Sequence, residues 1–195
     1  MNIYNKLIKV YPAEYFSISS TRTEIEEDDP NATTDKVIIQ HTGVEVLKIN
    51  KTLIVAERDN STSDYQSVCD GIIAIDETNK FIGYFELKSA CSTNNVLKAR
   101  NQIMDSYHHL KSIASQCTID MMAFAEKGII VTQPISDENF RKARLRRKRN
   151  EEHGNSFSPY HFLLNLLKGR ATIENIDMPL LHFNADQVIS IEALL

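Results

Sequence analysis

Two hydrophobic runs at residues 71–75 and 81–87 flank a short polar segment, and this pattern predicts a β-hairpin. With the turn centred on Thr78, Asp70 and Glu86 face each other, because each lies eight residues from the centre. Lys88 shares the face of Glu86, since side chains alternate along a strand. The opposite face is expected to form one apolar surface, made of Gly71, Ile73, Ile75, Phe81, Phe85 and Leu87.

Apolar segments before the hairpin predict two more strands and a short helix. Residues 44–49 and 53–56 have the composition of strands, and residues 50–52 supply a polar turn between them. Residues 1–11 carry enough apolar positions for a short helix. Two strands are therefore expected to precede the hairpin in the chain.

The region after the hairpin predicts a long helix followed by strand material. Apolar residues recur at helical spacing over 96–115, and Asn94 or Asn95 is suited to cap this helix. Residues 121–125 and 128–132 have the composition of buried strands. Residues 44–132 thus fit the order three strands, helix, strand, with one additional strand.

Capping residues define two further helices toward the C-terminus. Ser136 is suited to begin a helix that ends near Gly154, and Ser158-Pro159 begins a Leu-rich helix that Gly169 stops. The apolar segments 179–183 and 188–191 then predict strands that either extend the sheet or form a dimer surface.

Composition places the chain among ordinary globular proteins. It has 195 residues, of which 42% are hydrophobic and 25% charged, and this size suits one domain. No apolar run reaches the length of a membrane span, and the first residues lack a secretory leader, so a cytoplasmic location is expected. Three widely spaced cysteines indicate neither a disulfide framework nor a zinc ribbon.

Charge is distributed unevenly, although the net charge is only −4. Residues 24–29 carry five acids in six positions, and we interpret them as a flexible loop. Residues 141–149 carry seven bases in nine positions and fall on the helix that begins at Ser136. Nucleic acid binds to local positive potential, so this dense basic helix predicts phosphate contacts. The alternative is a solvated helix that pairs with the acidic segment. The candidate nucleic-acid-binding residues are Arg141, Lys142, Arg144, Arg146, Arg147, Lys148 and Arg149.

The polar face of the hairpin suggests metal chemistry. Two carboxylates facing each other across a hairpin repel, and a divalent cation between them removes that repulsion. Mg²⁺ prefers oxygen ligands and commonly uses one or two carboxylates together with water and phosphate oxygens. Lys88 adds a positive donor beside such an ion, suited to orienting water or stabilising negative charge.

Asp70, the hairpin and the sequence Glu86-Leu87-Lys88 together resemble the PD-(D/E)xK nuclease superfamily. The resemblance implies an α/β, restriction-endonuclease-like fold with a mixed central sheet flanked by helices. It implies Asp70, Glu86 and the Leu87 carbonyl as ligands of Mg²⁺ or Mn²⁺, and Lys88 as the catalytic lysine. Cys69 stands where the motif's name has proline. Residues 1–195 would then form a single nuclease domain, with its core at 44–132 and a basic helix and extension at 136–195.

The same resemblance raises two further questions about the site. The family often takes another acid from its first helix, but the sequence does not choose among several candidates. Gln102 is a candidate accessory residue on the long helix, although Tyr107 lies five residues later and does not match the family's Gln-x-x-x-Tyr spacing. An ordinary exposed glutamine is the alternative. The candidate acids are Glu14, Glu24, Glu26, Glu27 and Asp64.

These observations predict a metal-dependent nuclease that hydrolyses phosphodiester bonds, with DNA as the favoured substrate. Cleavage of both strands of a duplex would favour a homodimer. The alternative is a non-catalytic subunit that keeps the fold and binds nucleic acid or a partner protein. In a third interpretation, Glu86 and Lys88 form a structural ion pair and the basic helix docks on a partner protein.

Overall fold

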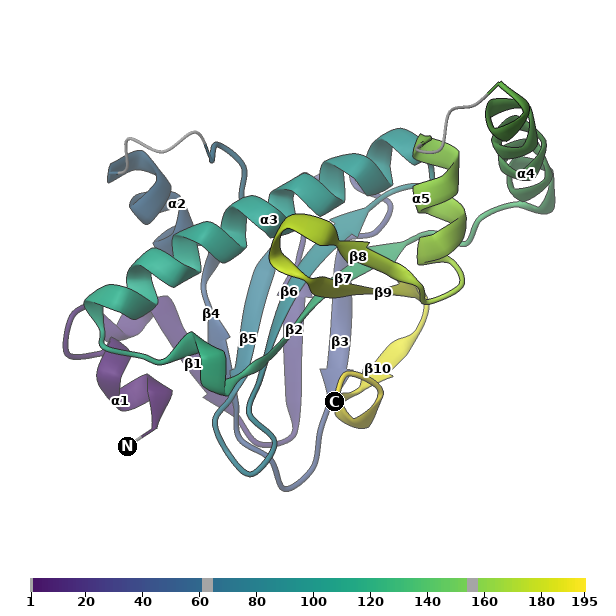
Figure 1. The fold of residues 1–195 in the computed structure, drawn as a ribbon. Helices are drawn as coiled ribbons and strands as arrows, with labels where there is room; N and C mark the ends of the chain where they lie inside the picture. The colour runs from purple at the N-terminus through teal and green to yellow at the C-terminus, as the bar shows by residue number, and fades with distance from the viewer. Residues whose placement is uncertain (1, 61–64, 154–157) are drawn as a thin grey trace.

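The computed structural model describes residues 2–60, 65–153 and 158–195, and within them the fold is mixed α/β (Figure 1). A seven-stranded sheet has the order β1-β4-β5-β6-β7-β9-β8, and a three-stranded sheet has the order β10-β3-β2. In chain order, the strands are β1 Phe16–Ser19, β2 Arg22–Glu26, β3 Lys36–Gln40, β4 Val46–Ile49, β5 Gly71–Ile75, β6 Phe81–Lys88, β7 Ala125–Thr132, β8 Ala171–Ile173, β9 Met178–Asn184 and β10 Val188–Ser190.

Five α-helices accompany these strands in the described residues. They are α1 Ile3–Leu7, α2 Lys51–Asn60, α3 Thr93–Gln116, α4 Asp137–Glu152 and α5 Pro159–Leu166. The long helix α3 crosses one face of the large sheet diagonally (Figure 1). No helix in the described part of the chain is long and apolar enough to cross a membrane.

The predicted hairpin register is confirmed. β5 and β6 are antiparallel, with Gly71 opposite Phe85 and Ile75 opposite Phe81. The backbone N–H of Asp70 continues this ladder by donating to the Phe85 carbonyl at 2.9 Å. Asp70 and Glu86 therefore lie at the end of the hairpin that is distant from its turn.

The hairpin is buried on both faces, which corrects the expectation of one core face and one polar face. On one side the predicted apolar surface packs against the three-stranded sheet, through residues such as Ile25 of β2 and Ile39 of β3. Gly71 permits this approach, because an added Cβ would lie 2.6 Å from the Ile25 Cδ1 atom. On the other side Ile72 and Tyr84 join a second core beneath α3. The acids thus lie in the interior of a layered molecule.

Residues 53–56 lie within α2, so the predicted strand there is wrong. Asn50 begins the helix: its side chain accepts from the Thr52 N–H and its carbonyl from the Leu53 N–H. Leu53 and Ile54 are buried on the inner side. A run of four apolar residues does not distinguish a buried strand from the buried turn of a helix.

Two other predicted segments also differ from the structure. Met121–Ala123 form a 3₁₀ turn rather than a strand, with the Met122 side chain exposed, and β7 begins at Ala125. The acidic segment 24–29 is not simply a flexible loop, because Glu24 and Glu26 belong to β2, which pairs with β3. Thr23 and Ile25 are buried and alternate with these acids, which is the pattern of a half-buried strand.

The predicted helix over 96–115 lies inside α3, but the cap is Ser92 rather than Asn94 or Asn95. The Ser92 side chain accepts from the Asn95 N–H. The apolar stripe from Val96 to Ala114 faces the sheet and contributes to its core. The helix therefore begins within a few residues of Lys88.

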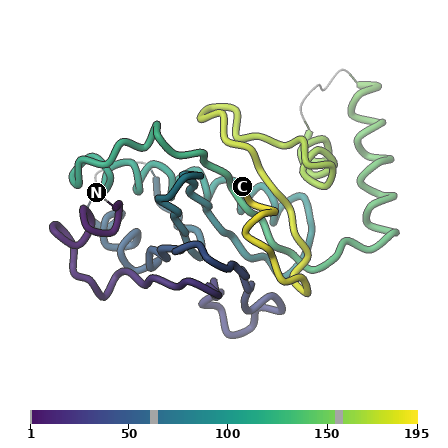
Figure 2. The backbone as a smooth tube through the Cα atoms, turned by 90° about the horizontal axis from the view of Figure 1, so that it is seen from below, coloured from purple at the N-terminus to yellow at the C-terminus, as the bar shows by residue number. Residues whose placement is uncertain are grey.

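The C-terminal elements that were predicted have boundaries close to those of the structure, whereas strand β8 was not predicted. Ser136 caps α4 and Ser158 caps α5, and Gly169 adopts a positive φ of 64° just beyond α5. β9 extends the large sheet beside β7, whereas β10 pairs in parallel with β3 of the small sheet. Seen from below in Figure 2, α4 stands away from the sheets and meets the rest of the molecule at α5.

Candidate metal centre

Three carboxylates from distant parts of the sequence converge at one end of the central hairpin. Asp70 precedes β5, Glu86 lies near the end of β6, and Glu27 follows β2 of the small sheet. One oxygen from each lies within 4.8 Å of the others. This spacing brings three hard oxygen donors within reach of one small divalent cation.

Asp70 is held in a fixed orientation by two donors. Its Oδ2 atom accepts from the Leu87 N–H at 2.7 Å, and its Oδ1 atom lies 3.1 Å from the Lys51 Nζ atom. Burial raises the pKa of Asp70, while the Leu87 N–H and the charge of Lys51 oppose that rise. The cross-strand pairing predicted from the sequence thus places Asp70 directly against the backbone of the Glu86-Leu87-Lys88 segment.

Glu86 is fully buried and only partly satisfied. Its Oε1 atom is ion-paired with the Lys88 Nζ atom, whereas its Oε2 atom has no hydrogen-bond partner. Burial, reinforced by the charge of Asp70, raises the pKa of Glu86 to about 8, against the opposing effect of Lys88. A buried carboxylate oxygen without a partner is costly, and a cation at that position would remove the cost.

Glu27 is the additional acid that the sequence could not single out. It follows a strand rather than a first helix, and Glu14, Glu24 and Glu26 are not part of the group. Asp64, the remaining candidate, lies outside the described residues. Glu27 lies at the site because the small sheet packs over the hairpin. Local sequence pattern does not predict this packing.

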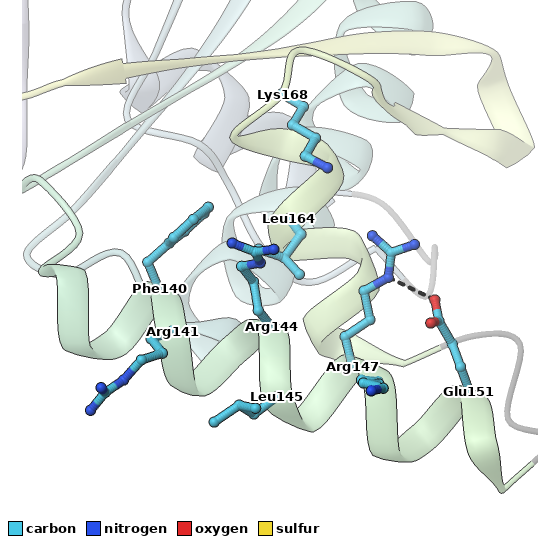
Figure 3. A pocket seen from close by; sticks show the side chains of 9 residues that line it. Phe140, Arg141, Arg144, Leu145, Arg147, Glu151, Leu164 and Lys168 are labelled. Atoms are coloured by element: carbon cyan, nitrogen blue, oxygen red, sulfur yellow. Dashed lines mark hydrogen bonds and ion pairs between the residues drawn. The ribbon is translucent and has the colours of Figure 1, made fainter.

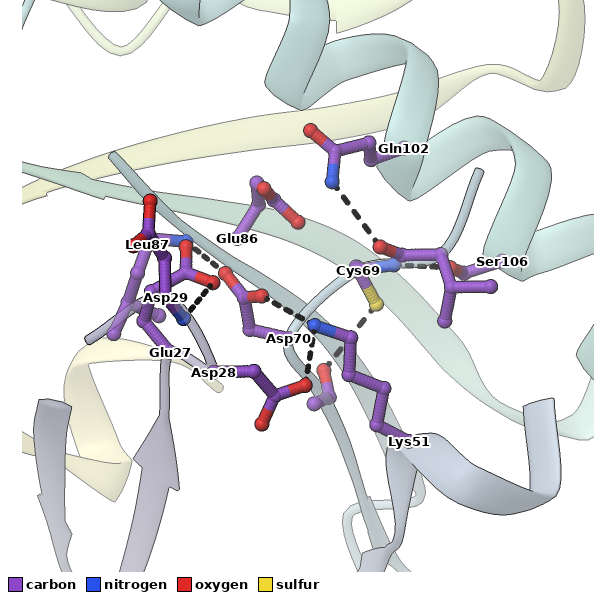
Figure 4. A network of polar contacts seen from close by, with 12 residues as sticks. Glu27, Asp28, Asp29, Lys51, Cys69, Asp70, Glu86, Leu87, Gln102 and Ser106 are labelled. Carbon is purple, nitrogen blue, oxygen red and sulfur yellow. Dashed lines mark hydrogen bonds and ion pairs between the residues drawn. The ribbon is translucent and has the colours of Figure 1, made fainter. Parts of the chain in front are cut away.

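Lys51 and Asp28 complete the network and were missed by the sequence analysis. The Lys51 Nζ atom lies 3.0 Å from the Asp28 Oδ2 atom as well as 3.1 Å from Asp70 (Figure 4). Although burial lowers the pKa of Lys51, its hydrogen bonds to Asp28 and Asp70 raise it above the ordinary value. Lys51 is the first residue of α2. Because residues 50–52 were predicted as a turn between strands, there was no reason from sequence to place this lysine at the site.

Helix α3 holds the segment that leads into Asp70. The Ser106 Oγ atom accepts from the Cys69 N–H at 2.7 Å, and the Gln102 Nε2 atom donates to the Val68 carbonyl at 3.1 Å. Gln102 is half-buried rather than exposed, and its Oε1 atom is a second buried atom without a partner. In Figure 4 this side chain lies on the α3 side of Glu86. Its role as an accessory residue remains a prediction.

The carboxylate cluster reaches the surface on the side of Glu27. Glu27 is partly exposed, the Asp28 side chain is 74% exposed and the Lys51 side chain is 23% exposed. The buried Glu86 and Asp70 therefore have partly exposed polar side chains as neighbours on this side.

The donor set fits a hard divalent cation. All the ligand atoms of the cluster are carboxylate oxygens. One carboxylate oxygen of Glu86, Oε2, has no hydrogen-bond partner. Mg²⁺ and Mn²⁺ accept such ligands, whereas zinc sites in proteins are built mainly from Cys and His. Leu87 uses its N–H to hold Asp70, and coordination by its carbonyl remains a prediction from the resemblance.

The basic residues of α4 form a separate surface. Six of the seven predicted phosphate-binding bases are exposed and Arg147 is partly buried, as expected for a helix with bases around most of its circumference. A groove of about 800 Å³ runs between α4 and α5 and is lined by bases together with Phe140, Leu145 and Leu164 (Figure 3). No residue of the carboxylate cluster lines this groove. The structure thus presents two charged regions of opposite sign.

Comparisons with protein-family models, with curated proteins and with solved structures found no match to this chain.

Proposed function

We propose that the chain is a divalent-metal-dependent phosphodiesterase that cleaves nucleic acid, with DNA as the favoured substrate, on a restriction-endonuclease-like fold. The observation that carries the proposal is the buried, unpartnered Oε2 atom of Glu86, within reach of Asp70 and Glu27 and beside Lys88. A structural ion pair alone leaves that oxygen unexplained. A metal ion that it ligates accounts for its burial.

Each side chain of the site has a distinct role in this proposal. Asp70, Glu86 and Glu27 would hold Mg²⁺ or Mn²⁺, which supplies a Lewis acid and an activated water when bound. The Leu87 N–H and Lys51 fix the Asp70 carboxylate so that it need not reorganise during the reaction. Lys88 would donate to a non-bridging phosphate oxygen, offsetting the negative charge that develops during attack.

The basic helix supports nucleic acid as the substrate. β7 pairs with β6 so that Thr132 lies beside Lys88, and α4 begins five residues after Thr132. The bases of α4 therefore extend from the end of the sheet at which Lys88 lies. A polyanion bound along α4 would be directed toward this end, because phosphate contacts position a nucleic acid without reading its sequence.

The proposal is tested by cleavage of plasmid and linear DNA with Mg²⁺ or Mn²⁺. Asp70→Asn and Lys88→Met are each expected to lower the rate at least 100-fold, because they remove a ligand and the adjacent ammonium group. Glu77→Gln and Lys80→Met are matched controls at the turn of the same hairpin, and both should keep the wild-type rate. Equal activity in all four variants would refute the assignment.

A second candidate function is a non-catalytic subunit that binds nucleic acid or a partner protein. The direct ion pair between Glu86 and Lys88 favours it, because that pair partly neutralises the site without a metal. Calorimetry separates the two functions. A nuclease binds Mn²⁺ through Asp70 and Glu86, whereas a scaffold shows the same weak heat of binding in wild-type and Glu86→Gln protein.

A further inference from the structure

Lys51 bridges two carboxylates from different segments of the chain. Its Nζ atom lies 3.1 Å from Asp70 Oδ1 and 3.0 Å from Asp28 Oδ2. In Figure 4 it approaches Asp70 from the side opposite Glu27. In sites with two divalent ions, the second ion shares a carboxylate with the first and takes further ligands beyond it. Here an ammonium group takes that position.

The two buried acids, Asp70 and Glu86, differ in how many of their carboxylate oxygens have a donor. Both Asp70 oxygens have donors, Lys51 and the Leu87 N–H, whereas Glu86 has one oxygen paired with Lys88 and one without a partner. Each carboxylate oxygen accepts two bonds, so the paired Asp70 oxygens keep capacity for a metal ion. The unsatisfied position is thus on the Glu86 side of Asp70, away from Lys51.

The charges of the network lead to the same conclusion. Four carboxylates, those of Glu27, Asp28, Asp70 and Glu86, are joined by proximity or by ion pairs to two ammonium groups. The excess of two negative charges equals the charge of one divalent cation. A second cation beside Lys51 would leave a cationic excess in a partly buried site, which is unfavourable at low effective dielectric. Asp29 is not counted, because its carboxylate is neither part of the three-acid cluster nor paired with Lys51 or Lys88; it accepts the Asn31 N–H at 2.9 Å.

We propose that Lys51 takes the place of a second divalent cation, and that each chain therefore binds one metal ion. The inference rests on the metal site of the proposed function and adds its stoichiometry. Lys51 acts through Asp70 and Asp28 as a positioning residue. It holds the Asp70 carboxylate toward the single ion and prevents Asp28 from recruiting another.

The test is a calorimetric titration of the intact chain with Mn²⁺, without nucleic acid. Wild-type protein is expected to bind one ion. Lys51→Met, which keeps the length of the side chain but removes its charge, is expected to bind two. Lys51→Arg and the control Lys80→Met should bind one. Adding Asp28→Asn to Lys51→Met should return the number to one, because the second ion loses its outer carboxylate.

The possible results separate this inference from the proposed function. Two ions bound by the wild-type chain, or one ion bound by folded Lys51→Met, would overturn the role of Lys51 while leaving a metal-dependent enzyme intact. Wild-type protein that binds no Mn²⁺ would instead reject the metal site itself. The wild-type count requires no substitution, and circular dichroism establishes whether Lys51→Met is folded.

Discussion

At the scale of single residues, the site depends on how the charge of Glu86 is balanced. A fully buried carboxylate requires a proton, an ammonium group or a metal ion nearby, and Lys88 reaches only one of its two oxygens. Burial and Asp70 together raise the pKa of Glu86 to about 8. Without metal, the folded protein therefore holds a proton here that the unfolded chain releases near its ordinary pKa.

This proton predicts an inverse dependence of stability on pH. Because the folded state binds the proton more tightly, the free energy of unfolding in EDTA should fall by roughly 3 kcal/mol as pH rises from 5 to 8. Glu86→Gln stays neutral, so its stability should lack this component. Chemical denaturation at several pH values measures the difference between the two proteins. Saturating Mg²⁺ should reduce the fall in the wild-type protein, since metal binds the ionised form. Parallel pH profiles for wild-type and variant would contradict the assignment of the buried proton to Glu86.

The same residues show what the sequence could and could not predict about the site. The pairing of Asp70 with Glu86 followed from the position of one turn, because register in a hairpin is determined by its loop. Glu27 could not be chosen among the candidate acids, since it is brought to the site by packing of the small sheet on the large one. The position of Lys51 at the site could not be predicted without knowing that α2 begins at this residue.

At the scale of elements, α3 acts as a support for the chain that leads to Asp70. Gln102, Asp105, Ser106 and His109 form a polar row along the helix and bond to residues 65–69. The apolar stripe of α3 was predictable from its period, whereas Gln102 alone in this polar row was predicted to have a role, as an accessory residue of the site. Polar helix positions are usually solvated, so their partners become evident only when the segment before β5 is placed beside them.

Removal of one bond in this row should weaken the fold and the site together. Ser106→Ala leaves the buried Cys69 N–H without an acceptor, and we expect a loss of about 1–3 kcal/mol in the free energy of unfolding. Mn²⁺ affinity should also fall, because Asp70 follows Cys69 directly. Ser115→Ala, at an exposed position of the same helix, is the control and should change stability by less than about 0.5 kcal/mol. Equal stabilities in the two variants would show that α3 does not hold this segment.

At the scale of the whole molecule, the basic surface of α4 and the buried carboxylate cluster lie in separate regions. The net charge of −4 conceals this arrangement, because most bases of α4 are exposed while the carboxylates of Glu27, Asp70 and Glu86 converge at the hairpin. The helix itself was predictable from its capping serine and dense charge. Its separation from the sheets, visible in Figure 2, was not, since it depends on α5 packing beside it.

This separation predicts that nucleic-acid binding and metal binding can be altered independently. Replacement of Arg144, Lys148 and Arg149 by Ala should weaken DNA binding and reduce the slope of log K against log salt by roughly two to three. Mn²⁺ affinity should not change. Lys9, Lys36 and Lys98 are exposed bases outside α4, and their replacement gives the same net charge. Fluorescence anisotropy at several salt concentrations distinguishes local contacts from a general charge effect. The same salt slope in both triple variants would exclude α4 as the binding surface.

The parallel pairing of β10 with β3 also bears on the order of events during translation. The ribosome releases β2 and β3 early, but β10, which pairs with β3, emerges only after nearly all the other described elements. The small sheet that carries Glu27 over the hairpin is therefore incomplete for most of synthesis. A nascent chain would hold Asp70 and Glu86 before the small sheet that carries Glu27 is complete, so under the proposed function metal binding and cleavage would be deferred until late in translation.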